Sequence, residues 1–298
     1  MSDTGHIHSC LIRSDGRAET LGDPALLFPY WSFTKTVIAV CALRLEEQGR
    51  LSLDDTVADR SITLGQCLTH TAGLPDYGAL PAYHRAVAGG EAPWPRDRLL
   101  SEALAQGALF PPGQGWRYSN IGYLFAREHL EAVSGCGLDT LVRQEITAPL
   151  GLHSVVLATT PESFAAVCWP EAAGYHPGWV YHGCLVGTAG DAARLLHALF
   201  AGALVQRKTL ARMMTPHPVG GVLPGRPWTT CGYGIGLMAG EAGASGRVIG
   251  HSGAGPFSVN AVYHFPDVVE PVTVACFTDG RDEGVAEFEA VRLAGGCA

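Results

Sequence analysis

The residues best placed to do chemistry are Ser32 and Lys35, in the segment FPYWSFTKTVIAVCALRLEEQGR. Ser32 stands where a helix is expected to begin, and the apolar run TVIAVCALRL predicts a buried helix that ends at Gly49. Side chains three residues apart lie on one face of a helix, within hydrogen-bonding reach. A serine hydroxyl becomes nucleophilic when a neighbour accepts its proton, and a lysine does this once burial destabilises its ammonium form. The spacing therefore indicates a serine nucleophile with a lysine base.

The alternative is that Ser32 only caps the helix and Lys35 lies at the surface. The chain has 14 serines and two lysines, so chance predicts roughly 0.1 pairs at this spacing. The start of a helix also suits the reaction, because the positive end of the helix dipole favours a developing alkoxide. The backbone N–H of Ser32 would then donate to the oxyanion of the reacting carbonyl group.

A second motif, Tyr118-Ser119-Asn120, precedes a helical run in GQGWRYSNIGYLFAREHLEAVSG. The phenol of Tyr118 can relay a proton between the serine, the lysine and a leaving group. The amide of Asn120 can hold the substrate or the lysine. The structural alternative is a turn with an Asn cap and a tyrosine in the core.

A third motif, His251-Ser252-Gly253, lies in IGHSGAGPFSVNAVYHF. It is typical of a strand that carries glycine where a ligand approaches closely. The backbone N–H of Ala254 would supply a second oxyanion donor, whereas the alternative is a glycine-rich hairpin turn. Gly250 to Ala254 also approaches the G-x-S-x-G nucleophile elbow with Ser252 as nucleophile, but that motif needs a following helix, and here Pro256 and a strand-like run follow.

Together, SFTK, YSN and HSG resemble the motifs of the class C β-lactamase and related serine hydrolase family, in the same order. That family includes DD-peptidases, D-aminopeptidases and β-lactamase-like esterases. The stretches LTHTAGLPDY and FPPGQGWRYSN also look like family sequence, so the resemblance runs from about Pro29 to the C-terminus. Only 31 residues precede Ser32, so the family's usual N-terminal helix is expected to be absent or reduced.

The resemblance implies an acyl-enzyme on Ser32, with Lys35 and Tyr118 sharing the roles of general base and general acid. Which of the two takes the first proton is left open. The residues expected to bind substrate or its oxyanion are Asn120, His251, Gly253 and Ala254. In β-lactam-binding relatives a lysine at the position of His251 faces the substrate carboxylate. A neutral histidine would hold a carboxylate less well at pH 7, which favours esterase, amidase or D-peptidase chemistry.

The expected fold is α+β, of the β-lactamase/transpeptidase type, with an antiparallel sheet from both termini, flanking helices and a mainly helical domain. Residues 1–298 would form one unit, divided into a sheet part of 1–30 plus 225–298 and a helical part of 31–224. Residues 5–21 predict two strands, and YGIGLM, RVIG, SVNAVYHF and PVTVACF predict further strands before the final helix EGVAEFEAVRLAG. N-caps are expected at Ser61, Asp97, Asp139 and Asp191.

Composition narrows the function further. Apolar residues make up 47% of the chain and charged residues 16%, so a large core is expected. The formal charge of −8 and the lack of a basic run argue against nucleic acid as a partner. No secretory signal and no run of about 18 apolar residues is present, and the nine cysteines include no C-x-x-C pair. A cytoplasmic protein with reduced thiols and no membrane contact is therefore predicted.

Two further stretches are candidates for ligand contacts. The aromatic, glycine-rich segment 174–191 is expected to line the pocket through Tyr175, Trp179, Tyr181 and His182, unless it only packs on the core. His6 and His8 followed by Cys10 suggest a metal, but no third convincing partner is present, so neither a metal nor a cofactor is expected.

The sequence therefore predicts a serine hydrolase that acts as an esterase, amidase or D-peptidase on a small ester, amide or peptide. The alternatives are a true β-lactamase or DD-peptidase, or a penicillin-binding-like sensor that is acylated without turnover.

Overall fold

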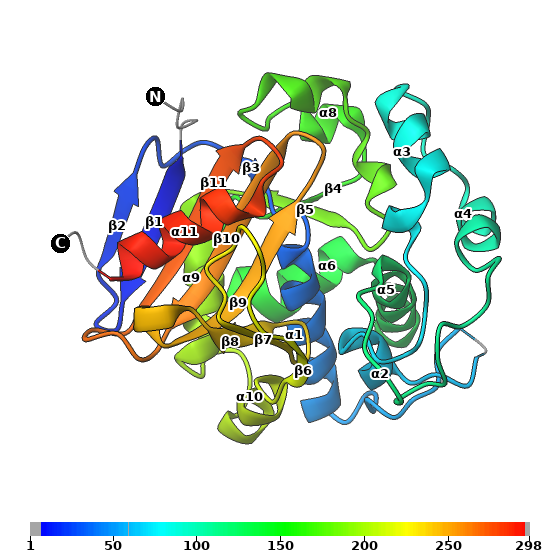
Figure 1. Cartoon of the computed structure of the whole chain (residues 1–298), viewed down its shortest axis with the longest axis horizontal. Coiled ribbons are helices and arrows are strands. Elements are labelled where there is room, and N and C mark those ends of the chain that lie inside the picture. The colour runs from blue at the N-terminus through cyan, green and yellow to red at the C-terminus, as the bar shows by residue number, and fades with distance from the viewer. Residues whose placement is uncertain (1–6, 59, 296–298) are drawn as a thin grey trace.

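The computed structural model describes residues 7–58 and 60–295. Within them, an eight-stranded sheet has the order β2-β1-β11-β10-β9-β8-β7-β6 (Figure 1). Every neighbouring pair of these strands is antiparallel. The strands are β1 (His8–Arg13), β2 (Ala18–Leu21), β6 (His217–Gly220), β7 (Thr230–Tyr233), β8 (Met238–Glu241), β9 (Arg247–Ala254), β10 (Ser258–Phe265) and β11 (Val272–Asp279). Because β1 pairs with β11, both ends of the chain build one sheet, as predicted.

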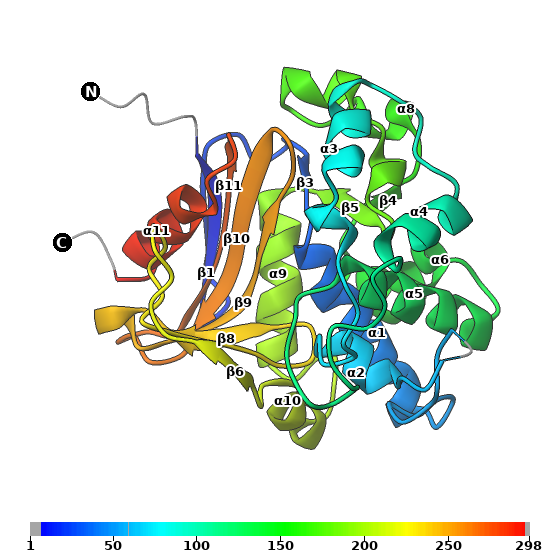
Figure 2. The same cartoon turned by 45° about the vertical axis from the view of Figure 1, so that its right-hand side comes forward.

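Two helices cover the central strands. Helix α11 (Glu283–Ala294) lies on one face of the sheet and α9 (Ala189–Phe200) on the other (Figure 2). Strand β10 alternates between them: Val259, Ala261 and Tyr263 belong to the core under α11, whereas Val262 belongs to the main core. A strand that is covered on both faces has to be apolar almost throughout, which explains the run SVNAVYHF.

The helical region packs around α1 (Phe33–Glu47), which contacts β9 and α5 (Asn120–Ser134). Helix α1 is buried on nearly all sides, because the sheet lies on one side of it and the helices lie on the other. The other helices here are α2 (Leu64–Leu68), α3 (Pro81–Ala88), α4 (Arg96–Ala103), α6 (Leu138–Val142), α7 (Ala148–Leu150), α8 (Pro161–Phe164) and α10 (Arg207–Met213). In the described residues, no helix is both long and apolar enough to cross a membrane.

A small second sheet holds the chain just before Ser32. It has the order β3-β5-β4, formed by β3 (Phe28–Pro29), β5 (Cys184–Gly187) and β4 (Val156–Ala158). The Tyr30 backbone N–H also donates to the Leu185 carbonyl oxygen at 2.7 Å. This sheet, which the sequence did not predict, brings the segment around His182 beside the start of α1.

Two local predictions were wrong. The run YGIGLM is not one strand: β7 ends at Tyr233, Gly234 N–H donates to the Leu237 carbonyl at 2.7 Å, and β8 begins at Met238. The predicted caps are displaced as well. For example, Thr188 caps α9 by accepting from Asp191 N–H at 3.1 Å, which places Asp191 in the first turn. The division into a sheet part and a helical part stays a prediction.

Candidate active site

Ser32 occupies the N-cap position of α1, yet its side chain makes no capping hydrogen bond. Its Oγ instead lies 3.0 Å from Lys35 Nζ and 2.8 Å from the Tyr118 hydroxyl. The hydroxyl is thus held between an amine from its own helix and a phenol from the loop before α5. This geometry favours the chemical interpretation of Ser32 over the capping one.

The turn that delivers Ser32 is strained at Trp31, whose φ is +43°. A left-handed conformation costs a bulky residue about 1–3 kcal/mol and persists only where its surroundings fix it. The Trp31 indole N–H donates to Ser258 Oγ at 2.9 Å, and its ring packs against Phe164, Tyr175 and Phe257. These contacts fix the backbone of the turn and thereby the position of Ser32 at the start of α1.

Lys35 is fully buried, and this burial lowers the pKa of its amine to about 7, with Asp76 acting in the opposite direction. Its Nζ lies 3.1 Å from His182 Nε2. Burial and the nearby lysine hold the pKa of His182 well below its usual value, so the neutral ring can accept a hydrogen bond from the amine. A lysine in this environment is available as a base near neutral pH.

The surroundings of Tyr118 shift its pKa in the opposite direction to the pKa of Lys35. Its ring lies 4.3 Å from that of His70, whose Nδ1 accepts the Ser119 backbone N–H at 3.1 Å. Burial, with Tyr233 nearby, raises the pKa of Tyr118 well above its usual value. The phenol therefore keeps its proton and is placed to donate it.

Asn120 is tied to a carboxylate that the sequence analysis did not single out. Its backbone N–H donates to Asp76 Oδ1 at 2.9 Å and its Nδ2 donates to Asp76 Oδ2 at 3.2 Å. Because a carboxylate only accepts, this pairing turns the amide so that its Oδ1 remains available. Asp76 lies within LTHTAGLPDY, so the resemblance of that stretch was the available signal.

Strand β9 reaches Ser32 along an edge that β8 leaves unpaired. Its residues 247–250 pair with β8, whereas in the described register residues 251–254 pair with β10 alone. A Cβ added at Gly253 would lie 2.9 Å from the Ser32 backbone nitrogen and 2.8 Å from the Tyr30 carbonyl oxygen. Gly253 is therefore required for this close approach, which brings Ala254 to the cleft beside Ser32.

Asn260 helps to hold this approach from the next strand. It is the β10 partner of Gly253, and its Nδ2 donates to the carbonyl oxygens of Pro29 and Tyr30 at 3.2 and 3.1 Å. The turn before Ser32 is thereby fastened to the sheet. The sequence analysis did not single out Asn260, because its role depends on contacts more than 200 residues away.

His251 is buried, and both of its ring nitrogens already have hydrogen-bond partners. Its Nδ1–H donates to the Ser252 carbonyl oxygen, which leaves Nε2 to accept from the Tyr233 hydroxyl at 2.9 Å. Burial, with Lys35 nearby, lowers the pKa of His251 to about 3, so the ring is neutral at pH 7. With both nitrogens engaged, His251 supplies no cation for a substrate carboxylate.

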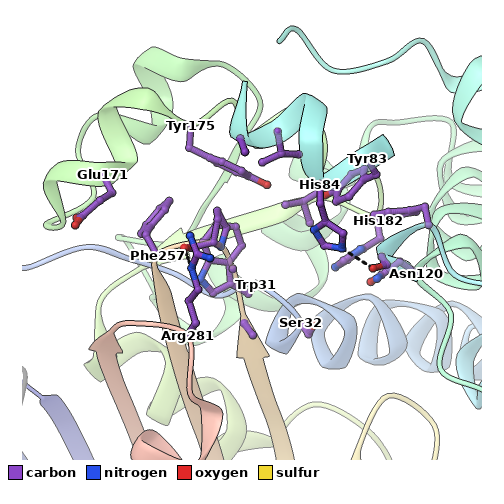
Figure 3. A pocket seen from close by; sticks show the side chains of 18 of the residues that line it. Trp31, Ser32, Tyr83, His84, Asn120, Glu171, Tyr175, His182, Phe257 and Arg281 are labelled. Carbon is purple, nitrogen blue, oxygen red and sulfur yellow. Dashed lines mark hydrogen bonds between the residues drawn. The ribbon is translucent and has the colours of Figure 1, made fainter. Parts of the chain in front are cut away.

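Two clefts meet at Ser32, and both are lined by Asn120 and Ala254 as well. The larger, of about 770 Å³, is the aromatic cleft, lined by the rings of Trp31, Tyr77, Tyr83, Tyr175 and Phe257 (Figure 3). The smaller, of about 440 Å³, is the charged cleft, lined by Tyr118, Arg226, Tyr233, His251, Ser252 and Glu283. A carbonyl group at Ser32 would therefore be within reach of both clefts.

The four candidates of the 174–191 segment have different positions. Tyr175 and His182 line the aromatic cleft, and His182 also contacts Lys35. Trp179 lines neither cleft, and its indole N–H donates to the Glu91 carbonyl oxygen at 3.1 Å. Tyr181 lines neither cleft: its hydroxyl donates to the Trp94 carbonyl at 2.9 Å and its ring packs against Tyr77. Tyr181 thus supports the wall of the aromatic cleft from behind.

Metal binding finds no support in the part of the chain that is described. No group of three or more His, Cys, Asp or Glu side chains there could hold a metal ion. His6 of the candidate His6–His8–Cys10 set lies outside the described residues.

The chain is similar to several known proteins. D-alanyl-D-alanine-carboxypeptidase/endopeptidase AmpH of Escherichia coli is 27% identical over 261 residues, covering 76% of this chain and 64% of AmpH. Esterase EstB of Burkholderia gladioli is 31% identical over 160 residues, covering 47% of this chain and 41% of EstB. The chain thus spans less than two thirds of either relative.

Comparison with solved structures and family models identifies the fold and the family. D-amino acid amidase from Ochrobactrum anthropi, 21% identical, superposes with a TM-score of 0.80 over 97% of this chain and 92% of the amidase. The predicted α+β fold of the β-lactamase/transpeptidase type is thereby confirmed. The family model described as Beta-lactamase matches residues 12–295. The chain therefore belongs to the β-lactamase family of serine hydrolases.

Proposed function

We propose that this protein cleaves a small ester or amide through an acyl-enzyme on Ser32. The observation that carries the proposal is the placement of Ser32 Oγ, 3.0 Å from Lys35 Nζ and 2.8 Å from the Tyr118 hydroxyl, where two clefts meet. Burial lowers the pKa of Lys35 to about 7 and raises that of Tyr118. We therefore assign the first proton transfer to Lys35.

In acylation, Ser32 Oγ bonds to the substrate carbonyl carbon and its proton moves to Lys35. The carbonyl oxygen becomes negative and is stabilised by the backbone N–H groups of Ser32 and Ala254. The bond to the leaving oxygen or nitrogen then breaks. That atom receives the proton that Lys35 took, with the Tyr118 hydroxyl as the last donor, because Tyr118 lines the charged cleft.

In deacylation, a water molecule attacks the acyl carbon and gives a proton to Lys35. The bond between that carbon and Ser32 Oγ breaks, and Oγ recovers the proton from Lys35. The acid leaves, and the net reaction adds one water to the substrate.

An ester or amide is favoured over a β-lactam by His251, which is neutral and has both ring nitrogens engaged. The named relatives are consistent with this choice, since they include an esterase, a D-amino acid amidase and a D-alanyl-D-alanine-carboxypeptidase. The cytoplasm is the proposed location, because all eight described cysteines are free thiols, as a reducing compartment favours.

The test is a panel of p-nitrophenyl esters, D-amino acid amides and nitrocefin, with intact-mass measurement of the protein during turnover. We expect repeated product release from an ester or amide and an acyl adduct on Ser32, both lost in Ser32→Ala. Equal rates for the wild type and Ser32→Ala would exclude Ser32 as the nucleophile. One stoichiometric burst without turnover would identify an acylated sensor instead.

A further inference from the structure

The charged cleft contains an ion-pair network that the proposed reaction does not use. Arg226 and Glu283 line the cleft, and Glu287 lies fully buried behind Arg226. The cleft extends to Ser32 and Tyr118, so part of any substrate that reacts at Ser32 has to lie beside this network.

The donors of Arg226 are largely occupied by the protein itself. Its Nε donates to Glu287 Oε2 at 2.6 Å, its Nη1 to Glu283 Oε2 at 3.1 Å, and its Nη2 to Ser252 Oγ at 2.9 Å and to Glu287 Oε1. Four of the five N–H groups of a guanidinium are thus engaged. Arg226 therefore has little left to offer a substrate carboxylate.

Glu283 can accept further hydrogen bonds. Its Oε1 accepts from Ser252 Oγ at 3.1 Å and its Oε2 accepts from Arg226, while 31% of its side chain stays exposed. Each carboxylate oxygen can accept a further hydrogen bond. Glu287, in contrast, is fully buried and accepts four hydrogen bonds from Arg226, Trp228 and Tyr263, so a ligand cannot reach it.

The charges of this network do not cancel. One guanidinium faces two carboxylates, so the network carries one excess negative charge. His251 on the same wall is neutral and engaged on both nitrogens. Trp116 also lines the cleft, but its indole nitrogen is buried and is not presented to a ligand. Through Glu283, the cleft can therefore serve a cationic donor.

Resting on the proposed function, we infer that the charged cleft selects a leaving group that carries an ammonium ion, which Glu283 binds, and disfavours one that carries a carboxylate. The leaving group is assigned to this cleft because Tyr118, its proton donor, lines it and does not line the aromatic cleft. The acyl part then lies in the aromatic cleft.

The experiment compares three phenylacetate esters of similar shape at pH 7.5. Their alcohols are 2-(dimethylamino)ethanol, 3-methylbutanol and 3-hydroxypropanoate, which carry a positive, a neutral and a negative group. We expect kcat/KM for the cationic ester to exceed that of the neutral ester by about tenfold, as a charge-assisted hydrogen bond predicts. The anionic ester should be about tenfold slower than the neutral ester.

The ratio of cationic to neutral kcat/KM is the readout, because any general effect of a substitution on the site cancels in it. Glu283→Gln keeps the shape and removes the charge, so this ratio should fall to about one. Glu289→Gln is the matched control on the same helix, where Glu289 pairs with Arg292 outside the cleft, and it should leave the ratio unchanged.

A second variant tests the same inference without touching the network. Leu223 is a half-buried residue of the cleft wall, so Leu223→Lys adds a positive charge at small cost in stability. It should lower the cationic-to-neutral ratio and raise the rate of the anionic ester. A lower ratio in Glu283→Gln alone, with no response in Leu223→Lys, would contradict a role for charge.

Failure of the proposed function and failure of the ammonium site give different results. If neither these esters nor any ester or amide of the panel is hydrolysed in a Ser32-dependent manner, the proposed function is wrong. If the esters are hydrolysed but the wild-type ratio is one or less, or Glu283→Gln leaves it unchanged, the ammonium site is wrong and the hydrolase proposal stands.

Discussion

The two clefts that meet at Ser32 have walls of different kinds. The aromatic cleft is lined by rings from separate segments, and these are held mainly by packing, as Trp31 is against Tyr175 and Phe257. The charged cleft is lined by polar groups that the protein itself ties down, such as His251 and Arg226. The aromatic cleft also contains Glu171 and Arg281, so the contrast lies in its rings, which can recognise the shape of an acyl group, whereas we infer that the charged cleft recognises the charge of the leaving group.

The largest effect should come from Lys35, which is buried beside Ser32 where the two clefts meet. Lys35→Met removes the proposed base, and we expect kcat/KM for a p-nitrophenyl ester to fall by about 10²–10⁴. In the wild type, the pKa of Lys35 near 7 predicts activity that rises with pH, is half-maximal at about pH 7 and levels off about one pH unit higher, since only the neutral amine accepts the proton. A flat profile between pH 6 and pH 8 would contradict this assignment.

Tyr118 lines the charged cleft, so the effect on kcat/KM of removing its hydroxyl should depend on the leaving group of the substrate. Tyr118→Phe removes the phenol but keeps the ring that packs on His70. We expect a loss of about 10² in kcat/KM for an alkyl ester or an amide, whose leaving atom needs a proton. A p-nitrophenyl ester should lose only a few-fold, and an equal loss for both substrates would remove the distinction between the clefts in proton transfer.

The aromatic cleft should respond to acyl size and not to the leaving group. Phe257→Ala should raise KM for a phenylacetyl ester by about tenfold, because buried ring contacts are lost. Trp31 keeps Phe164 and Tyr175 as ring partners, so an acetyl ester should be affected less. Phe288→Ala is a suitable control, since Phe288 on α11 is 52% exposed. If Phe257→Ala instead changed the preference for the charge of the leaving group, the two clefts would not be separate.

The smallest effect is expected at His251. In His251→Lys, the amine would have the Tyr233 hydroxyl and the Ser252 carbonyl as partners and would add a positive charge to the charged cleft. Turnover of nitrocefin, which carries a carboxylate, should rise about three- to fivefold relative to a neutral ester. His251→Gln is the neutral control, and an equal gain there would exclude charge as the cause.

What the sequence could predict depended on how far apart the partners lie in the chain. Ser32 and Lys35 are three residues apart, so one turn of helix is enough to bring them together. Asp76, Glu283 and Arg226 are common surface residue types, and only the tertiary fold brings them to the site. No spacing within the chain signals a contact such as that between Arg226 and Glu283.

The same difference between local patterns and contacts distant in the chain applies to the fold. The apolar runs of β9, β10 and β11 predicted strands, because strands covered on both faces leave a continuous pattern. YGIGLM has a similar composition but bends, since Gly236 has a φ of +69° and lies where a Cβ would come 2.4 Å from Ala39 Cβ. That bend reflects how closely α1 packs on the sheet, which periodicity does not reveal.

The missing side chain at Gly253 sets how near the sheet can come to the first turn of α1. An added carbon there would lie within 3 Å of three atoms, in Asn260, Tyr30 and Ser32. The proposed nucleophile comes from one layer of the molecule and the proposed oxyanion donor from the other. A single methyl group at Gly253 would therefore push the two layers apart beside Ser32.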